Sequence, residues 1–261
     1  MTEAGDVVLL DKEDNGIAVV TLNRPDQRNA VNPAVAQRLE AIVKAVEIDP
    51  AINVVVLTGA GGKVFSSGAD LKIAAAGRVD ELMTADGGFA GFVYARRRKP
   101  WIAAVEGLAL AGGCELALAC DLIVASRDSA FGLPEVARGL IAAAGGLFRL
   151  PKAIPVNVAR EIILTAGRLS AERAAAFGMV NRLTPSGEVL VQALALAGEI
   201  AANAPLAVQE SLAIVARVGT RQDGELQRQS DMALDRLKRT DDLIEGATAF
   251  VEKRSPIWKG R

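Results

Sequence analysis

The sequence predicts an α/β fold in residues 1–204, followed by a helical region in residues 205–261. Three short, continuous apolar runs are typical of strands buried on both faces of a parallel sheet. These runs are Asn53–Thr58, Ile102–Val105 and Leu122–Ala125. Helical or Gly-rich stretches separate them, as the crossovers between parallel strands require. Strand patterns stop near Pro205, so that position divides the two predicted units.

The N-terminal part predicts a hairpin and then a helix. The β-branched runs Val7–Leu10 and Ile17–Leu22 flank Glu13–Gly16, which contains the Asn-Gly pair typical of a tight hairpin turn. Asn32-Pro33 is typical of a helix start, because proline is tolerated in the first turn. The following apolar residues recur at helical spacing: Val35, Leu39, Ile42, Val43 and Val46.

The C-terminal part predicts three consecutive helices. Their expected ranges are Leu206–Val218, Gly224–Leu237 and Asp241–Lys253. The last helix carries apolar residues on one face, and Pro256 lies beyond its end, where a proline commonly follows a helix. The apolar residues of that face are Leu243, Ile244, Ala247, Phe250 and Val251.

Composition narrows the function classes. The chain has 261 residues, 51% of them apolar, and a net charge of −1, which gives no electrostatic reason to bind nucleic acid or an anionic membrane. No apolar run approaches the roughly 18 residues of a membrane span. The acidic stretch Met1–Asp6 lacks the order of a signal peptide, so we expect a cytoplasmic protein. Cys114 and Cys120 lie six apart in one apolar segment and are expected to be buried thiols, not a disulfide.

Histidine is absent from the whole chain. Its absence excludes Ser-His-Asp and Cys-His catalysis, histidine-ligated zinc and an imidazole general base. Acid–base chemistry must therefore use carboxylates, lysine, cysteine or the single tyrosine, Tyr94.

Three segments have the residue types of a backbone-lined site. Lys63–Lys72 follows a buried strand and contains small residues that let a ligand approach the main chain. Val105–Leu118 leads through Gly112-Gly113 into an apolar helix, whose first N–H groups have no internal partner. Ser129–Leu140 places Glu135 after Pro134, at a helix start. Taken singly, Glu115 and Glu135 also fit ordinary first-turn carboxylates that favour the helix dipole.

Together these segments resemble the enoyl-CoA hydratase/isomerase (crotonase) family in order, spacing and residue type. The resemblance covers nearly the whole chain. It is carried by Asn23-Arg24-Pro25, Arg28-Asn29-Ala30, Phe65–Lys72, Gly107–Glu115, Phe131–Glu135 and Ala249–Pro256. It implies a crotonase-type ββα spiral core in residues 1–204, with the active site, and a C-terminal region for trimerisation and completion of the CoA site in residues 205–261.

The resemblance also implies residue roles. The backbone N–H groups of Ala69 and Gly112 would hold the thioester oxygen of an acyl-CoA in an oxyanion hole. Glu115 would activate the water that adds at the β-carbon, and Glu135 would exchange the proton at the α-carbon. Because two close carboxylates titrate as a pair, this division of roles is approximate. We expect no metal, and no cofactor apart from the CoA of the substrate.

Several further positions match family contacts to CoA or substrate. They are Arg28, Ala30, Gly68, Ala69, Asp70, Leu71, Lys72 and Gly112, with Phe250 and Lys253 reaching CoA from a neighbouring subunit. For the cations the alternative is a solvated side chain, and for Phe250 it is a core position. The family's assembly implies a homotrimer or homohexamer, and its chemistry implies a role in fatty acid and lipid metabolism. The run Arg96–Lys99 has the charge to bind the phosphates of CoA, but a charged loop before the next strand explains it equally well, so we leave it out of the site.

The expected activity is hydration of a trans-2-enoyl-CoA, or the reverse dehydration. Alternatives within the fold are a Δ3-Δ2 enoyl-CoA isomerase and a carnitinyl-CoA-type dehydratase, and an alternative from another class is a non-catalytic acyl-CoA-binding protein. One departure stands out. Ala142 and Ala143 occupy the positions of a Pro-Gly pair common in family hydratases, so we expect a crowded backbone there, with a positive φ disfavoured at Ala143.

Overall fold

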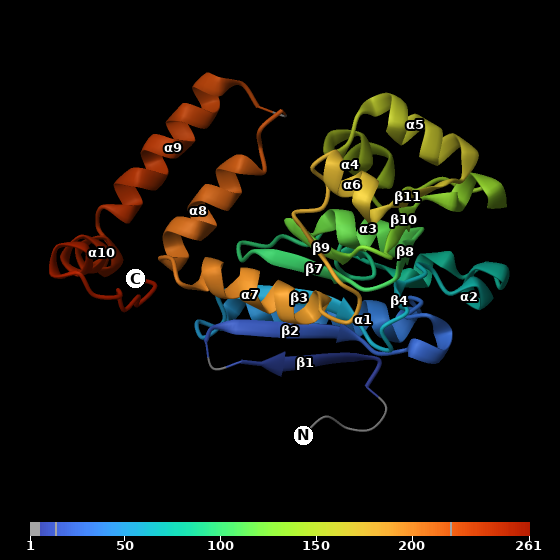
Figure 1. Cartoon of the computed structure of the whole chain (residues 1–261), viewed down its shortest axis with the longest axis horizontal. Helices are drawn as coiled ribbons and strands as arrows, with labels where there is room; N and C mark the ends of the chain where they lie inside the picture. The colour runs from blue at the N-terminus through green and yellow to red at the C-terminus, as the bar shows by residue number, and fades with distance from the viewer. Residues whose placement is uncertain (1–5, 14, 220) are drawn as a thin grey trace.

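The computed structural model describes residues 6–13, 15–219 and 221–261, and its body is built around two sheets (Figure 1). Within these residues the larger sheet has six strands in the order β1-β2-β3-β7-β9-β12. Only β1 is antiparallel to its neighbour; the other pairs are parallel. The strands are β1 (Val8–Lys12), β2 (Ile17–Leu22), β3 (Val54–Gly59), β7 (Trp101–Val105), β9 (Leu122–Ser126) and β12 (Arg182–Thr184).

The predicted hairpin and the three predicted parallel strands are confirmed, although Asp14 in the hairpin turn lies outside the described residues. Strand β3 shows why its sequence is continuously apolar. Val55 and Leu57 join the core on one face, whereas Val54 and Val56 join a second apolar cluster on the other. Side chains alternate across a strand, so burial on both faces leaves no position for a polar residue.

The smaller sheet has the order β11-β10-β8-β4. Its strands are β4 (Val64–Ser66), β8 (Leu108–Leu110), β10 (Ala130–Gly132) and β11 (Arg168–Ser170). Three consecutive strand pairs, β3 with β4, β7 with β8 and β9 with β10, each send their first strand to the larger sheet and their second to the smaller one. This repetition brings the ends of β4 and β8 together, because these two strands are parallel neighbours.

Helices cover both faces of the larger sheet. Helix α1 (Pro33–Ile48) begins at Asn32, whose side chain accepts a hydrogen bond from the backbone N–H of Val35. All five apolar residues predicted for its core face are buried. Helix α7 (Val189–Ala201) packs its small residues on the opposite face, over β3, β7 and β9.

The other helices of the body surround the smaller sheet and the connections (Figure 1). The α-helices are α2 (Leu71–Ala75), α3 (Gly112–Ala119), α4 (Gly146–Ala153), α5 (Val156–Thr165) and α6 (Ala171–Ala176). The 3₁₀ helices are η1 (Pro25–Gln27), η2 (Val79–Leu82) and η3 (Pro134–Arg138), and a short hairpin pairs β5 (Met83–Thr84) with β6 (Gly88–Phe89).

Three helices extend from the body at the C-terminal end: α8 (Pro205–Val215), α9 (Asp223–Leu237) and α10 (Asp241–Glu252) (Figure 1). The prediction placed the end of the first at Val218, which is wrong by one turn. The backbone N–H groups of Arg217 and Val218 instead donate to the carbonyls three residues earlier, those of Ile214 and Val215. Lys253 was expected inside the last helix, but its φ of 55° makes it the left-handed residue that ends α10.

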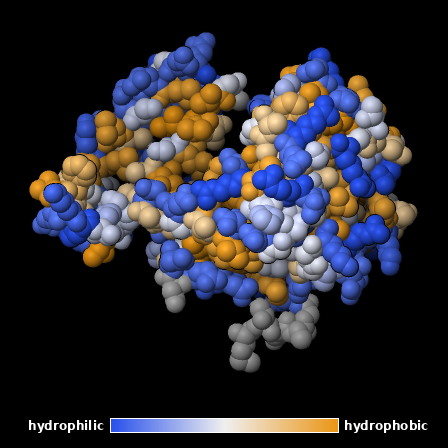
Figure 2. Space-filling model, viewed as in Figure 1, coloured by the Kyte–Doolittle hydropathy of each residue, from blue (hydrophilic) through white to orange (hydrophobic). Residues whose placement is uncertain are grey.

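The final residues fold back onto this extension. The indole N–H of Trp258 donates to the carbonyl of Ala202 at 2.7 Å, and the carboxylate of Asp242 accepts from the N–H groups of Lys259 and Gly260. The extension still exposes many large apolar side chains, and Figure 2 shows a hydrophobic surface on the side of the α8–α9 pair that faces the body.

Three further findings concern the described residues alone. No single helix there is long and apolar enough to cross a membrane, although α7 and α8 together meet that criterion across a bend of 105°. No group of three or more metal-ligating carboxylates or thiols occurs in the same part of the chain. Cys114 and Cys120 are both free, as predicted, and burial raises the pKa of the Cys120 thiol to about 12.

Candidate active site

Two backbone segments meet where β4 and β8 end. Gly68 follows β4, and Gly112 begins α3 just after β8. A side chain on Gly68 would place its Cβ 2.6 Å from the backbone nitrogen of Gly112, so these two residues touch through their main chains. Gly68 also has a φ of 83°, a conformation that other residues rarely adopt. Glycine is required at position 68 both by conformation and by space.

The N–H groups of Ala69 and Gly112 face this junction. Val31 donates to the carbonyl of Gly68 and accepts from the N–H of Asp70, at 2.8 and 2.9 Å. In such a parallel bridge the N–H of the intervening residue, Ala69, points to the opposite side. Gly112 is the first residue of α3, so its N–H has no acceptor within the helix. Two N–H donors on adjoining segments can therefore bind one oxygen atom.

The peptide that carries the Gly112 N–H is held in an unusual conformation. Ala111 has φ 51° and ψ −129°, a region that favours glycine. Its own N–H donates to the carbonyl of Gly132 at 2.9 Å, and its carbonyl accepts from the N–H of Glu115. Strain of this kind costs about 1–3 kcal/mol and is concentrated at functional sites. This conformation of Ala111 turns the peptide between residues 111 and 112 toward the junction.

Buried polar side chains fix the segment before Ala69. The hydroxyl of Ser66 donates to the carbonyl of Asn29 at 2.8 Å and accepts from the N–H of Gly68 at 3.2 Å. The amide of Asn29 donates in turn to the carbonyls of Ala60 and Val64. These bonds satisfy buried groups that would otherwise be costly. The loop is thereby preorganised before any ligand binds.

Glu115 lies in the first turn of α3 and is almost fully buried, with 3% of its surface exposed. Its Oε1 accepts from the N–H of Gly146 at 2.9 Å. The pKa of Glu115 is raised to about 7, mainly by burial and in addition by the charge of Glu135, whereas the backbones of Gly146 and Ala144 and the charge of Arg149 lower it. This raised pKa lets the carboxyl group gain or lose a proton near neutral pH.

Glu135 lies on η3 and is less buried than Glu115. Its Oε2 is shielded from solvent and has no hydrogen-bond partner among residues 6–13, 15–219 and 221–261. Burial raises the pKa of Glu135, while its own backbone N–H and the charge of Arg138 lower it. A buried carboxylate oxygen without a partner is costly unless something else binds it. Its placement suits an oxygen that meets a ligand.

The two carboxyl groups interact, because the charge of Glu135 raises the pKa of Glu115. A pair of this kind, in which both pKa values are raised by burial, can hold one proton near neutral pH. It then offers one acid and one base at the same time. Next to the N–H groups of Ala69 and Gly112, such a pair can move protons beside a bound carbonyl group.

The residues predicted to contact CoA differ in how exposed their side chains are. Arg28 and Lys72 are exposed and form no ion pair among the described residues, and Leu71 is exposed beside Lys72. The carbonyl of Arg28 accepts from the N–H of Ser67 at 3.0 Å, which places Arg28 beside the loop. Ala30 is buried.

Asp70 has a structural bond that the sequence did not suggest. Its carboxylate accepts from the guanidinium of Arg24 at 3.1 Å and from the N–H of Lys72 at 3.1 Å, so it ties η1 to the start of α2. Arg24 also donates to the carbonyl of Ala30. The side chain of Asp70 is therefore bonded within the protein, and the predicted contact of Asp70 with the ligand stays a prediction.

Phe250 and Lys253 lie on the C-terminal extension, which projects away from the junction of β4 and β8 (Figure 1). Phe250 is 86% exposed, so it is not a core residue of this chain. Lys253 ends α10 and is also exposed. The single chain does not bring these two residues to the carboxylates, and their predicted contact from a neighbouring subunit stays a prediction.

The segment with Ala142 and Ala143 is less strained than expected. Neither alanine is among the described residues with a positive φ, so the expected conformational penalty at Ala143 is absent. Ala142 is buried, whereas Ala143 is exposed and its carbonyl accepts from the hydroxyl of Tyr94 at 2.9 Å. The backbone here follows a path that suits residues with a side chain.

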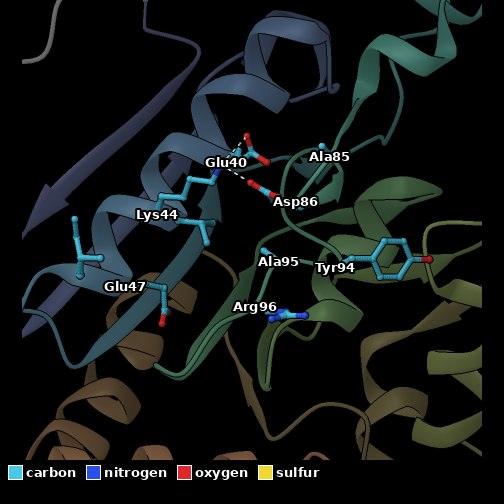
Figure 3. Close-up of a pocket in the computed structure, with 11 residues that line it drawn as sticks. Glu40, Lys44, Glu47, Ala85, Asp86, Tyr94, Ala95 and Arg96 are labelled. Carbon is cyan, nitrogen blue, oxygen red and sulfur yellow. Dashed lines mark hydrogen bonds and ion pairs between the residues drawn. The ribbon is translucent and has the colours of Figure 1, made fainter.

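A pocket of about 540 Å³ lies beside α1, and neither carboxylate lines it (Figure 3). Three of its charged residues pair with each other, since Lys44 contacts Asp86 at 2.7 Å and Glu40 at 3.4 Å. Tyr94 also lines this pocket, but its ring points away from the charged group (Figure 3). The pocket is therefore separate from the paired carboxylates.

The sequence interpretation gave no role to Arg149, named Tyr94 only among possible acid–base groups, and included Ser66 only as part of the Phe65–Lys72 segment. Arg149 is partly buried, and its guanidinium lies 5.5 Å from the ring centre of Tyr94 and 5.3 Å from that of Phe148. It donates to the carbonyls of Ala144 and Val93. A cation within an otherwise apolar helix start was the available signal for Arg149. Nothing in the local sequence indicated which carbonyls it or Tyr94 would reach.

Known proteins are similar to nearly the whole chain. The enoyl-CoA hydratase/isomerase family model matches residues 12–261. A carnitinyl-CoA dehydratase from Proteus mirabilis (strain HI4320) is 37% identical over 247 residues, which are 93% of this chain and 94% of the relative. The crystal structure of an enoyl-CoA hydratase from Mycobacterium tuberculosis H37Rv has a TM-score of 0.93 and 45% identity, over 98% of this chain and 100% of that one. A carnitinyl-CoA dehydratase structure from Mycobacterium avium 104 has a TM-score of 0.74 and 44% identity, over 98% and 100% of the two chains.

Proposed function

This chain belongs to the enoyl-CoA hydratase/isomerase family, and we propose that it is a hydro-lyase that adds water across the 2,3 double bond of a trans-2-enoyl-CoA thioester, or catalyses the reverse dehydration. The observation that carries this proposal is the pairing of the buried Glu115 with the partly buried Glu135, next to the N–H groups of Ala69 and Gly112, for which the described residues offer no hydrogen-bond acceptor. The family shows the crotonase fold, as the sequence predicted.

The main-chain donors act on the thioester oxygen. When water adds at C3 of an enoyl thioester, the electrons of the double bond move toward the carbonyl, and negative charge develops on its oxygen. The N–H groups of Ala69 and Gly112 stabilise that charge more strongly than they stabilise the neutral carbonyl. A preorganised donor of this kind contributes about 10²–10³ in rate. Ser66 fixes the loop that carries the Ala69 N–H, and the bond from Ala111 to Gly132 fixes the peptide next to Gly112, so both donors are preorganised.

The carboxyl groups move the two protons. Glu115 in its ionised form takes a proton from water, and the hydroxide adds to C3. Glu135 in its protonated form gives a proton to C2, which completes the addition of one water molecule. The unpartnered Oε2 of Glu135 supports its contact with a reacting group. Acid–base help of this kind contributes about 10²–10⁴ in rate.

The CoA portion is held by groups around the same loop. Arg28 and Lys72 are exposed cations that suit the phosphates of CoA. Ala30, Gly68, Asp70 and Leu71 complete this side of the site, with Gly68 and Ala69 presenting their main chains. Phe250 and Lys253 of a neighbouring subunit complete the CoA site. The exposure of Phe250 supports a contact made from a neighbouring subunit.

The direct test is incubation of the protein with crotonyl-CoA while the loss of the enone absorbance is followed. We expect turnover by the wild-type protein, and a loss of about 10²–10⁴ in kcat for Glu115→Gln and for Glu135→Gln. Glu106→Gln is the matched control, because Glu106 is partly buried and accepts a hydrogen bond from the N–H of Gly187, with no bond to either carboxylate among the described residues. Absence of turnover across short, medium and branched enoyl-CoAs would contradict the proposal.

The same variants separate hydration from isomerisation. A Δ3-Δ2 isomerase needs one carboxylate to carry one proton between two carbons. Activity on a 3-enoyl-CoA that survives Glu115→Gln and is lost in Glu135→Gln would therefore support an isomerase. Tight binding of an acyl-CoA in calorimetry, without turnover of any substrate, would support a non-catalytic acyl-CoA-binding protein.

A carnitinyl-CoA-type dehydratase is the second candidate, favoured by the relatives of that name. It would use the same two carboxylates to remove water from a substrate whose acyl group carries a quaternary ammonium. Comparing kcat/KM for carnitinyl-CoA with that for an uncharged 3-hydroxyacyl-CoA of equal length separates the candidates. A ratio well above one would assign the carnitinyl substrate to this chain.

We propose in addition that the protein is a homotrimer or homohexamer, resides in the cytoplasm and serves fatty acid and lipid metabolism without a metal or a separate cofactor. The apolar side chains exposed on α10 and the end of the chain support the assembly, because an isolated chain would leave them in water. Light scattering coupled to gel filtration tests it. A monomer at micromolar concentration would contradict this part of the proposal.

A further inference from the structure

The segment Ala142–Gly146 links the two sides of the candidate site. It follows η3, which carries Glu135, and it leads into α4. It also donates to Glu115, through the N–H of Gly146 at 2.9 Å and through the backbone of Ala144. The position of the Glu115 carboxylate therefore depends on how firmly this segment is held.

The segment makes few backbone hydrogen bonds within itself among the described residues. The N–H of Ala143 donates to the carbonyl of Ile141 at 2.8 Å, and Gly145 accepts from the first turn of α4. Gly145 has a φ of 111°, and a side chain there would collide with the guanidinium of Arg149. The segment is an irregular connection, and such connections depend on contacts from outside.

Two side chains supply those contacts. The hydroxyl of Tyr94 donates to the carbonyl of Ala143 at 2.9 Å, and the guanidinium of Arg149 donates to the carbonyl of Ala144 at 3.1 Å. The guanidinium also donates to the carbonyl of Val93, next to Tyr94. We call Tyr94 and Arg149 the loop clamp.

The bond from Tyr94 is aligned with Glu115 through one peptide group. The carbonyl of Ala143 and the N–H of Ala144 belong to the same peptide. Tyr94 donates to its oxygen, and its N–H side stabilises ionised Glu115. Hydrogen bonds arranged in such a chain polarise and strengthen one another. Tyr94 therefore acts on Glu115 without touching it.

We infer that Tyr94 and Arg149 are positioning residues, which hold the Ala142–Gly146 segment so that its N–H groups stay on the Glu115 carboxylate. This inference rests on the proposed role of Glu115 as the base. The charged and titratable groups that face Glu115 are Glu135 from η3, Arg149 from α4 and Cys114 on its own helix. Of these, Arg149 is the one cation, so it both tethers the segment and favours the ionised form.

The test measures the pKa of Glu115 in the full-length protein by NMR with glutamate labelled at the carboxyl carbon. The resonance of Glu115 is identified by its loss in Glu115→Gln. We expect a pKa near 7 in the wild-type protein. Arg149→Met should raise it by about 1, because an opposite charge and a tether are lost together. Tyr94→Phe and Arg149→Lys should raise it by less, since each removes hydrogen bonds and keeps the charge.

Activity supplies a second readout. A rise in pKa from about 7 to about 8 lowers the ionised fraction of Glu115 at pH 7 about fivefold, so kcat/KM for crotonyl-CoA should be about fivefold lower in Arg149→Met than in the wild-type protein. At pH 9 Glu115 is ionised in both proteins, so the ratio of their kcat/KM values should approach one, although both lose rate as Glu135 loses its proton. A variant with a merely loosened structure would lose activity equally at both pH values. Arg173→Met is the matched control, because Arg173 lies over the ring of Phe177 at 5.7 Å and pairs with Glu161, outside the site.

An unchanged pKa of Glu115 in both Tyr94→Phe and Arg149→Met would overturn the inference, whatever happens to the rate. Tyr94→Phe keeps the aromatic ring, so it provides a folded variant if Arg149→Met melts early. If the wild-type protein turned over no enoyl-CoA, the proposed function would fail, but the NMR titration would still decide whether the loop clamp acts on Glu115.

Discussion

The two sides of the candidate site are built in opposite ways. On the α3 side, Glu115 is buried, its Oε1 is bound by a backbone N–H, and the neighbouring loop is held by the hydroxyl of Ser66. On the η3 side, Glu135 stands on a 3₁₀ helix whose next residues are exposed, and its Oε2 has no partner within the described chain. Glu115 is held in position by the protein, whereas Glu135 has an oxygen that can still accept a hydrogen bond from a ligand.

This difference suits a reaction that moves two protons. The fixed carboxylate has its position and pKa set by the protein, so it can activate a small molecule such as water in one orientation. The available carboxylate can adjust to the carbon that it protonates. Burial raises both pKa values, but only on the α3 side do backbone N–H groups from a distant segment compete with that rise. The site therefore has a rigid half and an adaptable half.

The largest expected effect comes from crowding the rigid half. Gly68→Ala would place a methyl group 2.6 Å from the nitrogen of Gly112, at a φ of 83°. The two N–H donors would separate, and we expect kcat for crotonyl-CoA to fall by about 10²–10³. Gly139→Ala is the control on the η3 side, because Gly139 has a similar φ of 69° but nothing within 4 Å of an added Cβ.

Steady-state kinetics on both variants measure the contrast. Gly139→Ala should lose about 1 kcal/mol of stability and little of the rate, since its cost is conformational. If the two variants lost the same rate, the contact between Gly68 and Gly112 would not be what forms the donor pair. A KM that rises with kcat unchanged would likewise place the contact in binding and not in catalysis.

The next effect concerns stability. Glu115 has a pKa of about 7 in the folded protein, against an ordinary pKa of 4.5 for an exposed glutamate. The folded state therefore binds more protons than the unfolded state between these pH values, and stability is lost as the pH rises through this window. Because the group is buried, the loss amounts to about 3 kcal/mol. Glu115→Gln cannot ionise and should escape it, so the variant should be the more stable protein at pH 8.

Urea unfolding at pH 4.5 and pH 8 checks this expectation. The difference in unfolding free energy between Glu115→Gln and the wild-type protein should grow between the two pH values, since all other groups are shared. Glu135→Gln should change the slope in the same direction by less, because Glu135 is only partly buried. Equal slopes for both variants would remove the distinction between the two sides.

Much of the fold follows from local sequence patterns. The alternation of buried faces in β3, the Asn32 cap of α1 and the helices after Pro205 depend on neighbouring residues, which is why they were predictable. The family resemblance then supplied the pairing of Glu115 with Glu135, which spacing alone left open. The end of the helix beginning at Pro205 was misplaced because the apolar pattern continues through a turn with a different hydrogen-bond spacing.

Long-range polar contacts could not be predicted. In the run Arg96–Lys99, the guanidinium of Arg97 lies 4.1 Å over the ring of Phe92, and the amine of Lys99 is buried against the carbonyls of Val46 and Asp49. Two of these four cations therefore face inward, which no property of the run itself indicates. The loop clamp is a similar case, because Tyr94 reaches Ala143 across 49 positions of sequence.

The smallest expected effect is a gain in stability on the α3 side. Ala111 has φ 51° and ψ −129°, which glycine adopts without steric cost. Ala111→Gly should therefore increase the free energy of unfolding by about 1 kcal/mol, measured by urea unfolding. Ala109→Gly is the matched control on the same connection, because Ala109 is a buried residue of strand β8 and should lose stability. If Ala111→Gly also lost stability, the Ala111 methyl group would contribute more by packing than its conformation costs, and the rigid half would owe its order to side-chain contacts and not to a strained peptide.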